Sequence, residues 1–229
     1  MDSIAANLQA VRARIARAAQ AAHRAPGDIL LLAVSKTIPA ECIAEAHAAG
    51  QRAFGENHVQ EAVEKITVLA TLPLDWHFIG PIQSNKTRLI AEHFSWAHSV
   101  EREKIAERLN AARPEGMAPL NVCIQVNVSG EATKSGVAPG DEAKLAEAIA
   151  RLPRLRLRGL MAIPEPTADV TLQRRRFALL RELKDGLRAR GHALDTLSMG
   201  MSDDFEAAIL EGATIVRIGT AIFGPRQRT

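Results

Sequence analysis

A lysine follows the end of an apolar stretch near the start of the chain. Residues 29–34 read Ile-Leu-Leu-Leu-Ala-Val, which predicts a strand buried on both faces, and Lys36 comes two residues later. A lysine at this place is either a surface residue whose stem lies on apolar neighbours or a partly desolvated amine. Desolvation favours the neutral amine, the form that condenses with an aldehyde. Position alone leaves both interpretations open.

Two later segments carry residue types that bind phosphate. Residues 198–204 read Ser-Met-Gly-Met-Ser-Asp-Asp, and residues 217–224 read Arg-Ile-Gly-Thr-Ala-Ile-Phe-Gly. Small residues let a ligand approach the backbone, while Ser198, Gly219 and Thr220 offer hydroxyl and N–H donors. Each segment alone is a weak signal. Because both follow predicted strands, the seventh and the eighth, a phosphate site is the favoured interpretation.

Three further polar residues stand at predicted strand ends. Arg217 alternates with Gly219 along one strand, so it would present a permanent cation to a ring nitrogen if it pointed inward. Asn57 and Asn127 end two other strands. A structural role remains equally open for these residues.

The elements that must position these residues alternate along the chain. An amphipathic helix carrying Ile4, Leu8, Val11 and Ile15 on one stripe comes first. Strands are predicted over residues 29–34, 53–57, 76–80, 95–100, 120–128, 155–163, 196–200 and 214–219. Helices are predicted over residues 39–49, 58–70, 85–93, 101–112, 141–151, 171–190 and 203–211. This pattern predicts a single domain, residues 1–229, folded as a TIM-type (β/α)8 barrel with an extra N-terminal helix. The rival, an open doubly wound sheet, seldom needs eight such units.

Two local patterns sharpen that prediction. Residues 120–128 alternate apolar and polar side chains, which points the apolar face at helices and the face with Cys123 at the barrel interior. Asp203 and Glu206 have the spacing of a capping box, so a helix is expected to begin at Ser202 or Asp203.

Composition excludes several classes of protein. The 229 residues include 47% hydrophobic and 24% charged residues, with a net charge of only +3. Without a basic stripe interleaved with aromatics, nucleic-acid binding has little support. No window approaches the length of a membrane span, and the N-terminus does not resemble a leader. Cys42 and Cys123 form no CxxC pair, which favours reduced thiols and a cytoplasmic protein.

Metal and hydrolase chemistry find little support. The histidines show no HExxH or paired ligand spacing, and no GxSxG elbow appears. His77, inside the third predicted strand, is interpreted as a hydrogen-bonded interior histidine.

Taken together, these stretches resemble the pyridoxal phosphate homeostasis family, the YggS/PROSC-like proteins. The matching residues are 33–36 (AVSK), 54–57 (FGEN), 76–86 (WHFIGPIQSNK), 126–130 (VNVSG), 134–136 (KSG), 157–161 (LRGLM), 198–204 (SMGMSDD) and 217–224 (RIGTAIFG). They cover nearly the whole chain in order. One departure is His58, where the family usually has tyrosine.

The resemblance implies a fold like the barrel domain of alanine racemase, with pyridoxal 5′-phosphate held as an internal aldimine on Lys36. It further implies that Ser198, Gly219 and Thr220 hold the phosphate. Arg217 would face the pyridine nitrogen, and Asn57 would lie beside the ring. The family is associated with intracellular vitamin B6 balance, without an established turnover reaction.

Three classes of function stay open. A cofactor-binding and delivery protein, passing pyridoxal 5′-phosphate to apo-enzymes, is favoured because the chain has no tyrosine to act as a second racemase base. An arginine on the ring nitrogen also makes the cofactor a poorer electron sink. The alternatives are an amino-acid racemase or lyase of low activity with Lys36 as its base, and a Schiff-base aldolase that needs no cofactor. Lys86 and Lys134 are the other lysines that could carry an aldehyde, and the chain is expected to be a monomer.

Overall fold

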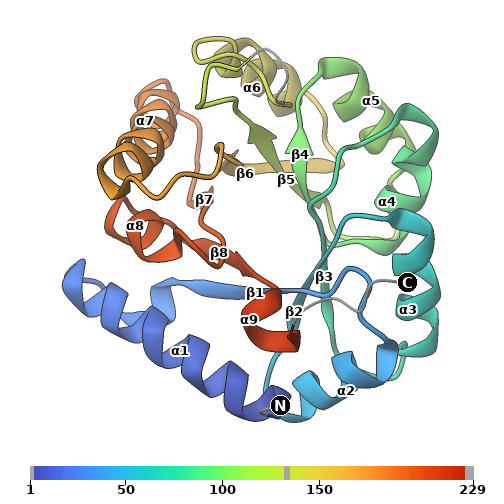
Figure 1. The fold of residues 1–229 in the computed structure, drawn as a ribbon. Coiled ribbons are helices and arrows are strands. Elements are labelled where there is room, and N and C mark those ends of the chain that lie inside the picture. The colour runs from blue at the N-terminus through green and yellow to red at the C-terminus, as the bar shows by residue number, and fades with distance from the viewer. Residues whose placement is uncertain (1–2, 132–134, 225–229) are drawn as a thin grey trace.

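The computed structural model describes residues 3–131 and 135–224 and shows a closed barrel of eight parallel strands in sequence order (Figure 1). The strands are β1 (Leu30–Val34), β2 (Ala53–Glu56), β3 (Asp75–Phe78), β4 (Trp96–Val100), β5 (Leu120–Gln125), β6 (Leu155–Met161), β7 (Thr196–Ser198) and β8 (Ile215–Ile218). β1 pairs with both β2 and β8, which closes the sheet. The predicted barrel is confirmed.

Helices form the outer ring of the barrel (Figure 1). They are α1 (Ile4–Ala21), α2 (Ala40–Ala48), α3 (Val59–Val68), α4 (Thr87–His93), α5 (Glu103–Ala112), α6 (Glu142–Ala150), α7 (Val170–Ala189), α8 (Phe205–Leu210) and α9 (Thr220–Phe223). Short 3₁₀ turns lie at Pro26–Asp28 and Ser84–Lys86. Within the described residues, no helix has the length and apolarity to cross a membrane.

The N-terminal helix α1 packs on the outside of the barrel, beside α8 and α9 (Figure 1). Its buried stripe includes Leu8, Val11 and Ile15, three of the four residues that predicted it. Ser3 caps the helix by accepting a hydrogen bond from the backbone N–H of Ala6 at 3.2 Å. The extra helix thus covers the part of the barrel where β8 meets β1.

Apolar side chains divide between an outer and an inner core. On β5, Val122 and Ile124 belong to the large cluster between strands and helices, whereas Cys123 belongs to a small cluster inside the barrel. The predicted alternation is therefore confirmed. The strand is shorter than expected, because after Gln125 the chain leaves the sheet and Val126 pairs with Val137 in an isolated bridge.

The helix after β7 begins two or three residues later than predicted. α8 starts at Phe205, and its N-cap residue Asp204 makes no side-chain cap hydrogen bond. Instead, the Asp204 carboxylate accepts a hydrogen bond from the backbone N–H of Met201 at 2.6 Å. Glu206, the other half of the expected capping box, forms an ion pair with Arg14 of α1 at 2.7 Å. The capping-box prediction was wrong because a tertiary partner engages Glu206.

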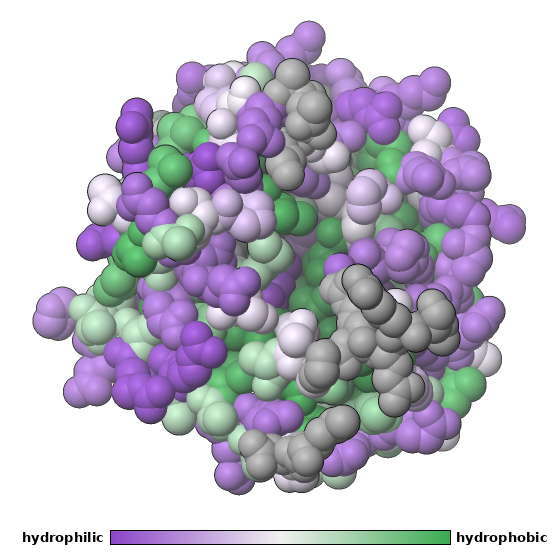
Figure 2. Space-filling model, viewed as in Figure 1, coloured by the Kyte–Doolittle hydropathy of each residue, from purple (hydrophilic) through white to green (hydrophobic). Residues whose placement is uncertain are grey.

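The face in view in Figure 2 is hollowed at its centre. Apolar residues surround the hollow, and hydrophilic residues lie toward the rim.

Candidate functional site

A pocket of about 240 Å³ lies at the carboxyl ends of the strands, where β1 and β8 meet. Four of the six predicted site residues line it: Lys36, Arg217, Gly219 and Thr220. The other lining residues are Val34, Ile38, Met201, Ser202, Asp203, Phe223 and Gly224. The fold therefore joins the segment after β1 with the two segments that the sequence marked for phosphate.

Lys36 is half-buried, and buried polar bonds hold the residue before it. The Ser35 hydroxyl donates to the Glu56 carboxylate at 2.6 Å, and the Lys65 ammonium donates to the Ser35 carbonyl at 2.8 Å. Lys65 also pairs with Glu56 at 3.0 Å. The backbone on the N-terminal side of Lys36 is thus fixed by β2 and α3.

The residue after Lys36 is held in the same way. The backbone N–H of Thr37 donates to the Glu61 carboxylate at 2.6 Å, and Glu61 pairs with Lys65 at 2.5 Å. Thr37 has a φ of +63°, a conformation that costs a β-branched residue free energy and persists where neighbours enforce it. Glu61 therefore helps to fix the direction in which the chain leaves Lys36.

The two carboxylates of this network have opposite pKa shifts. Burial raises the pKa of Glu56, against the opposing effects of Lys65 and Ser35. For Glu61, burial also acts upward, but the hydrogen bonds from Lys65 and Thr37 outweigh it and hold the pKa below its usual range. A hydrogen-bonded buried ion pair of this kind is costly to break from one side.

Arg217 forms the cationic inner wall of the pocket. Its guanidinium donates to the Ser198 hydroxyl and to the Ala162 carbonyl, each at 2.8 Å. Burial lowers the pKa of Arg217 to about 10, with the nearby Asp204 opposing the shift, so the group remains a cation at neutral pH. The inward orientation that the sequence left open is the one observed.

Gly219 and Thr220 bring the start of α9 against the end of β1. A Cβ on Gly219 would lie 3.0 Å from the carbonyl oxygen of Val34, so the absence of a side chain permits the close approach. Thr220 begins α9, where first-turn N–H groups have no acceptor within the helix. Hydroxyl and N–H donors thus face the same space as Lys36.

Ser198 and Asn57 do not line the pocket. Ser198 is fully buried inside the barrel, with its hydroxyl 2.8 Å from both Arg217 and the His98 Nδ1. The Asn57 Oδ1 is buried and has no hydrogen-bond partner within the described residues. A Cβ on Gly80 would lie 2.4 Å from the Asn57 carbonyl oxygen, so Gly80 presses on this backbone. The predicted contacts of Ser198 and Asn57 with a cofactor stay predictions.

Asn127 and Lys86 do not line the pocket. Asn127 shapes its own loop: its side chain donates to the Glu131 carbonyl at 2.6 Å and accepts from the backbone N–H groups of Ser129 and Gly130. Lys86 ends the short turn before α4. Lys134 lies outside the described residues.

Sequence reasoning missed the network of Glu56, Glu61 and Lys65. One signal was present, because Glu61 and Lys65 are four residues apart on a predicted helix. Nothing local indicated that Lys65 would reach the Ser35 carbonyl. His77 is, as predicted, an interior histidine with hydrogen-bond partners, Asp75 and His98.

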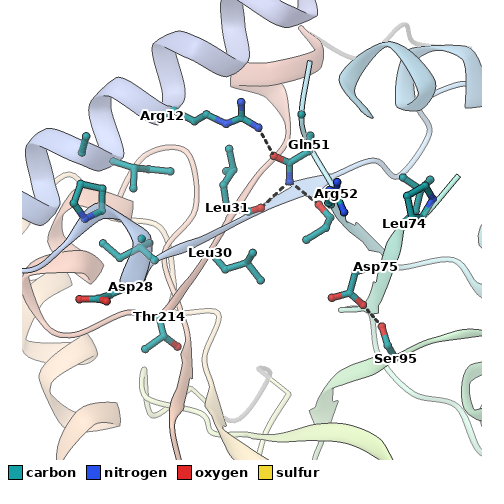
Figure 3. Close-up of a pocket in the computed structure, with 18 residues that line it drawn as sticks. Arg12, Asp28, Leu30, Leu31, Gln51, Arg52, Leu74, Asp75, Ser95 and Thr214 are labelled. Atoms are coloured by element: carbon teal, nitrogen blue, oxygen red, sulfur yellow. Dashed lines mark hydrogen bonds between the residues drawn. The ribbon is translucent and has the colours of Figure 1, made fainter. Parts of the chain in front are cut away.

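A larger pocket of about 1080 Å³ lies at the opposite end of the barrel, at the amino ends of the strands (Figure 3). Leu30, Asp75 and Thr214 contribute to its lining, and Gln51 spans its wall by donating to the carbonyls of Leu31 and Ala53. None of the six predicted site residues lines this pocket.

Known proteins resemble this chain over almost its whole length. The family model for the alanine racemase N-terminal domain matches residues 6–227. A Pseudomonas aeruginosa protein named pyridoxal phosphate homeostasis protein is 66% identical, over 99% of this chain and 97% of that relative. The Escherichia coli K12 protein of the same name is 56% identical, over 99% of this chain and 98% of its own length.

Solved structures give the same result. PipY of Synechococcus elongatus, solved without PLP, is 40% identical with a TM-score of 0.86, covering 96% of this chain and 100% of PipY. PipY with PLP bound is 38% identical with a TM-score of 0.84 over the same shares. Alanine racemase of Corynebacterium glutamicum, at 19% identity and a TM-score of 0.69 over 98% of this chain and 60% of that enzyme, shares the fold. The chain therefore belongs to the alanine racemase N-terminal domain family and, within it, to the pyridoxal phosphate homeostasis proteins.

Proposed function

We propose that this chain binds pyridoxal 5′-phosphate through Lys36 and takes part in the intracellular homeostasis of the cofactor. The observation that carries the proposal is the pocket itself, in which half-buried Lys36 faces Arg217, Gly219 and Thr220. The names of the relatives and the PLP-bound PipY structure support the same assignment.

The residues of the pocket fit the chemical groups of this cofactor. Lys36, half-buried at the pocket, supplies an amine that can condense with an aldehyde. The hydroxyls of Ser202 and Thr220, with the backbone at Gly219, supply donors for a phosphate. The absence of a Cβ on Gly219 lets the start of α9 lie close to Val34, which brings the backbone of Gly219 to the pocket. Bound pyridoxal 5′-phosphate would supply an aldehyde that condenses with amines and a ring that withdraws electrons from them.

The pocket also favours holding the cofactor over rapid turnover. Arg217 is a buried cation that we assign to the pyridine nitrogen, where a permanent positive charge disfavours ring protonation. A two-base racemase would need a tyrosine or a comparable base opposite Lys36, and the chain has no tyrosine. A racemase or lyase of low activity, with Lys36 as its single base, is the alternative.

Delivery to apo-enzymes that use the cofactor completes the proposal. A monomeric cytoplasmic protein would release or hand over its cofactor where those enzymes are made. Mixing the loaded protein with an apo-transaminase, with and without a membrane between them, measures whether delivery needs contact.

The deciding experiment replaces Lys36 by alanine. The purified native protein should show a visible absorbance band that Lys36→Ala loses entirely, while the circular dichroism spectrum of the fold stays unchanged. Borohydride reduction followed by peptide mass spectrometry should place the adduct on Lys36. Lys104→Ala, on the exposed side of α5, is the matched control and should keep the band.

Three outcomes would contradict the proposal. A trapped adduct that persists in Lys36→Ala would place the aldehyde on another lysine, with Lys86 and Lys134 the first to examine. A colourless native protein that forms no adduct with added pyridoxal 5′-phosphate would favour an aldolase. Amino-acid turnover at ordinary enzyme rates, lost in Lys36→Ala, would establish the racemase or lyase instead.

A further inference from the structure

A continuous line of hydrogen bonds crosses the inside of the barrel from one mouth to the other. It starts at Asp75, which lines the pocket at the amino ends of the strands (Figure 3). The His77 Nε2 lies 3.1 Å from the Asp75 carboxylate, and its Nδ1 lies 2.9 Å from the His98 Nε2. The His98 Nδ1 lies 2.8 Å from the Ser198 hydroxyl, which accepts from Arg217 at 2.8 Å. The line ends at the candidate cofactor pocket.

The two ends of this line fix the direction of every bond. A guanidinium only donates, so Ser198 accepts from Arg217, and its own hydrogen can go to the His98 Nδ1. A carboxylate only accepts, so the His77 Nε2 carries the hydrogen that points at Asp75. With the His98 Nδ1 accepting from Ser198, the His98 Nε2 carries the hydrogen and donates it to the His77 Nδ1. Every bond of the line then has one donor and one acceptor.

The reverse arrangement leaves a buried hydrogen without an acceptor. If the His77 Nδ1 donated to His98, the His98 Nδ1 would have to donate to Ser198. The Ser198 oxygen would then accept twice, from His98 and from Arg217, and its hydrogen would have no further partner among the described residues, although Ser198 is fully buried. Leaving a buried donor unsatisfied is unfavourable, so the single direction is the stable one.

Electrostatics at the two ends agree with this direction. Burial, reinforced by the nearby Arg217 cation, holds the pKa of His98 well below its usual range, so this ring is neutral. Burial acts upward on Asp75, but hydrogen bonds from His77 and Ser95 outweigh it and hold the Asp75 pKa below its usual range. Neutral His98 thus lies between the Asp75 anion at one mouth and the Arg217 cation at the other.

The packing of the barrel interior locks both rings. His77 stacks on Trp96, with centroids 5.3 Å apart and planes 6° from parallel, and His98 lies tilted against the same ring at 5.6 Å. The Arg158 guanidinium covers Trp96 at 4.9 Å from the ring centroid. Cys123 shares the interior, and burial raises its thiol pKa to about 12, so it adds no charge at neutral pH.

We propose that Asp75, His77 and His98 act through Ser198 as positioning residues for Arg217, fixing where its guanidinium meets the bound cofactor. Only the contact between Arg217 and the bound cofactor rests on the proposed function; the hydrogen bonds that hold Arg217 do not. It also gives the Ser198 hydroxyl a partner other than phosphate: with its hydrogen donated to His98, this hydroxyl holds Arg217, and Ser202 and Thr220 are left to hold the phosphate.

The direction of the line is tested on the protein without cofactor. Nitrogen-15 NMR of the histidine rings should show a hydrogen on the Nε2 and none on the Nδ1 of both His77 and His98. Assignment comes from the loss of one set of signals in His77→Gln and of another in His98→Gln. An Nδ1–H tautomer at either ring would overturn the proposal.

The positioning role is tested with a double-mutant cycle on the dissociation constant for pyridoxal 5′-phosphate. His98→Gln should weaken binding about tenfold, the loss expected for one hydrogen bond. In an Arg217→Gln background the same change should have no further effect, because the residue on which His98 acts is gone. His93→Gln at the end of α4 is the matched control and should bind as the native protein does.

A spectroscopic signature separates positioning from mere loss of structure. If His98 fixes Arg217 at the ring, His98→Gln and Ser198→Ala should shift the pH midpoint of the visible band in the same direction as Arg217→Gln. Additive losses in the cycle, or an unshifted midpoint, would overturn the proposal. Absence of binding by the native protein would instead overturn the proposed function, and the NMR result would still decide the direction of the line.

Discussion

Lys36 and Arg217, the two basic residues of the pocket, are held by contrasting surroundings. The backbone around Lys36 is fixed from outside the barrel by charged groups, the pair of Glu56 with Lys65 and the neighbouring Glu61. Arg217 is fixed from inside the barrel by neutral groups, with Ser198 and His98 next in line.

The difference follows from where solvent can reach. The Glu61 side chain keeps 31% of its surface exposed, so part of the outer network remains hydrated and can carry charge. His98 and Ser198 have no exposed surface, and an extra charge there would be strongly penalised. A line of neutral groups still transmits orientation, because each donor and acceptor dictates the next. Partly hydrated ion pairs therefore hold the backbone around Lys36, and buried hydrogen bonds of fixed direction hold Arg217.

The largest effect on stability is expected from removing Lys65, the cation of the outer network formed by Glu56, Glu61 and Lys65. Lys65→Met leaves Glu56 buried without its partner, and the free energy of unfolding at neutral pH should fall by about 3–5 kcal/mol. The loss should shrink in acid, because Glu56 can then be protonated. Denaturant unfolding at several pH values measures both effects.

The exposed pair of Arg88 and Glu92 provides the control for that experiment. It has the same four-residue spacing as Glu61 and Lys65 but lies at 3.9 Å with the Arg88 side chain 78% exposed. Arg88→Met should change stability by no more than about 0.5 kcal/mol. Equal losses of stability in Lys65→Met and Arg88→Met would show that the buried pair contributes no more than the exposed one.

A change within the pocket should affect binding rather than stability. Thr220→Ala removes one hydroxyl from the proposed phosphate site and should weaken binding of pyridoxal 5′-phosphate by about 1.5–3 kcal/mol, the range for hydrogen bonds to charged groups. Isothermal titration of the protein without cofactor gives the affinity. Thr67→Ala on the exposed side of α3, where the hydroxyl bonds only to the Val63 carbonyl, is the control. An unchanged affinity in Thr220→Ala would argue against this phosphate site.

The smallest expected effect concerns His98, in the line of hydrogen bonds inside the barrel. It should appear in the pH dependence of the free energy of unfolding. The folded pKa of His98 lies well below the unfolded value of 6.5, so its contribution is complete above pH 6.5 and is lost as the pH falls toward the folded pKa. One such group gives a slope of about 1.4 kcal/mol per pH unit in that window. His98→Gln should flatten the unfolding free energy below pH 6.5. A slope identical to that of the native protein would show that His98 is not held neutral.

Much of the fold could be predicted because its strands and helices follow from patterns of neighbouring residues in the sequence. The alternation of residues 120–128 assigned Cys123 to the inside of the barrel, and the run at 29–34 placed Lys36 at a strand end. Strand order then followed from the fold class, which brings the segment after β8 next to β1. Four of the six site residues line one pocket for that reason.

The sequence alone determined how apolar residues repeat along each helix and strand, and which residue stands at each strand end. Both depend only on residues that are close in the chain. The tertiary structure decided which side chains from distant parts of the sequence form hydrogen bonds with one another. His98 on β4 and Ser198 on β7 are 100 residues apart and bond only because the closed barrel places them across one interior. Likewise, Lys65 reaches the Ser35 carbonyl only when α3 packs beside β1 and β2. Lys36 and Arg217 could be found by their positions, but the groups that hold them could not, because hydrogen bonding across a barrel leaves no periodic signal in the chain.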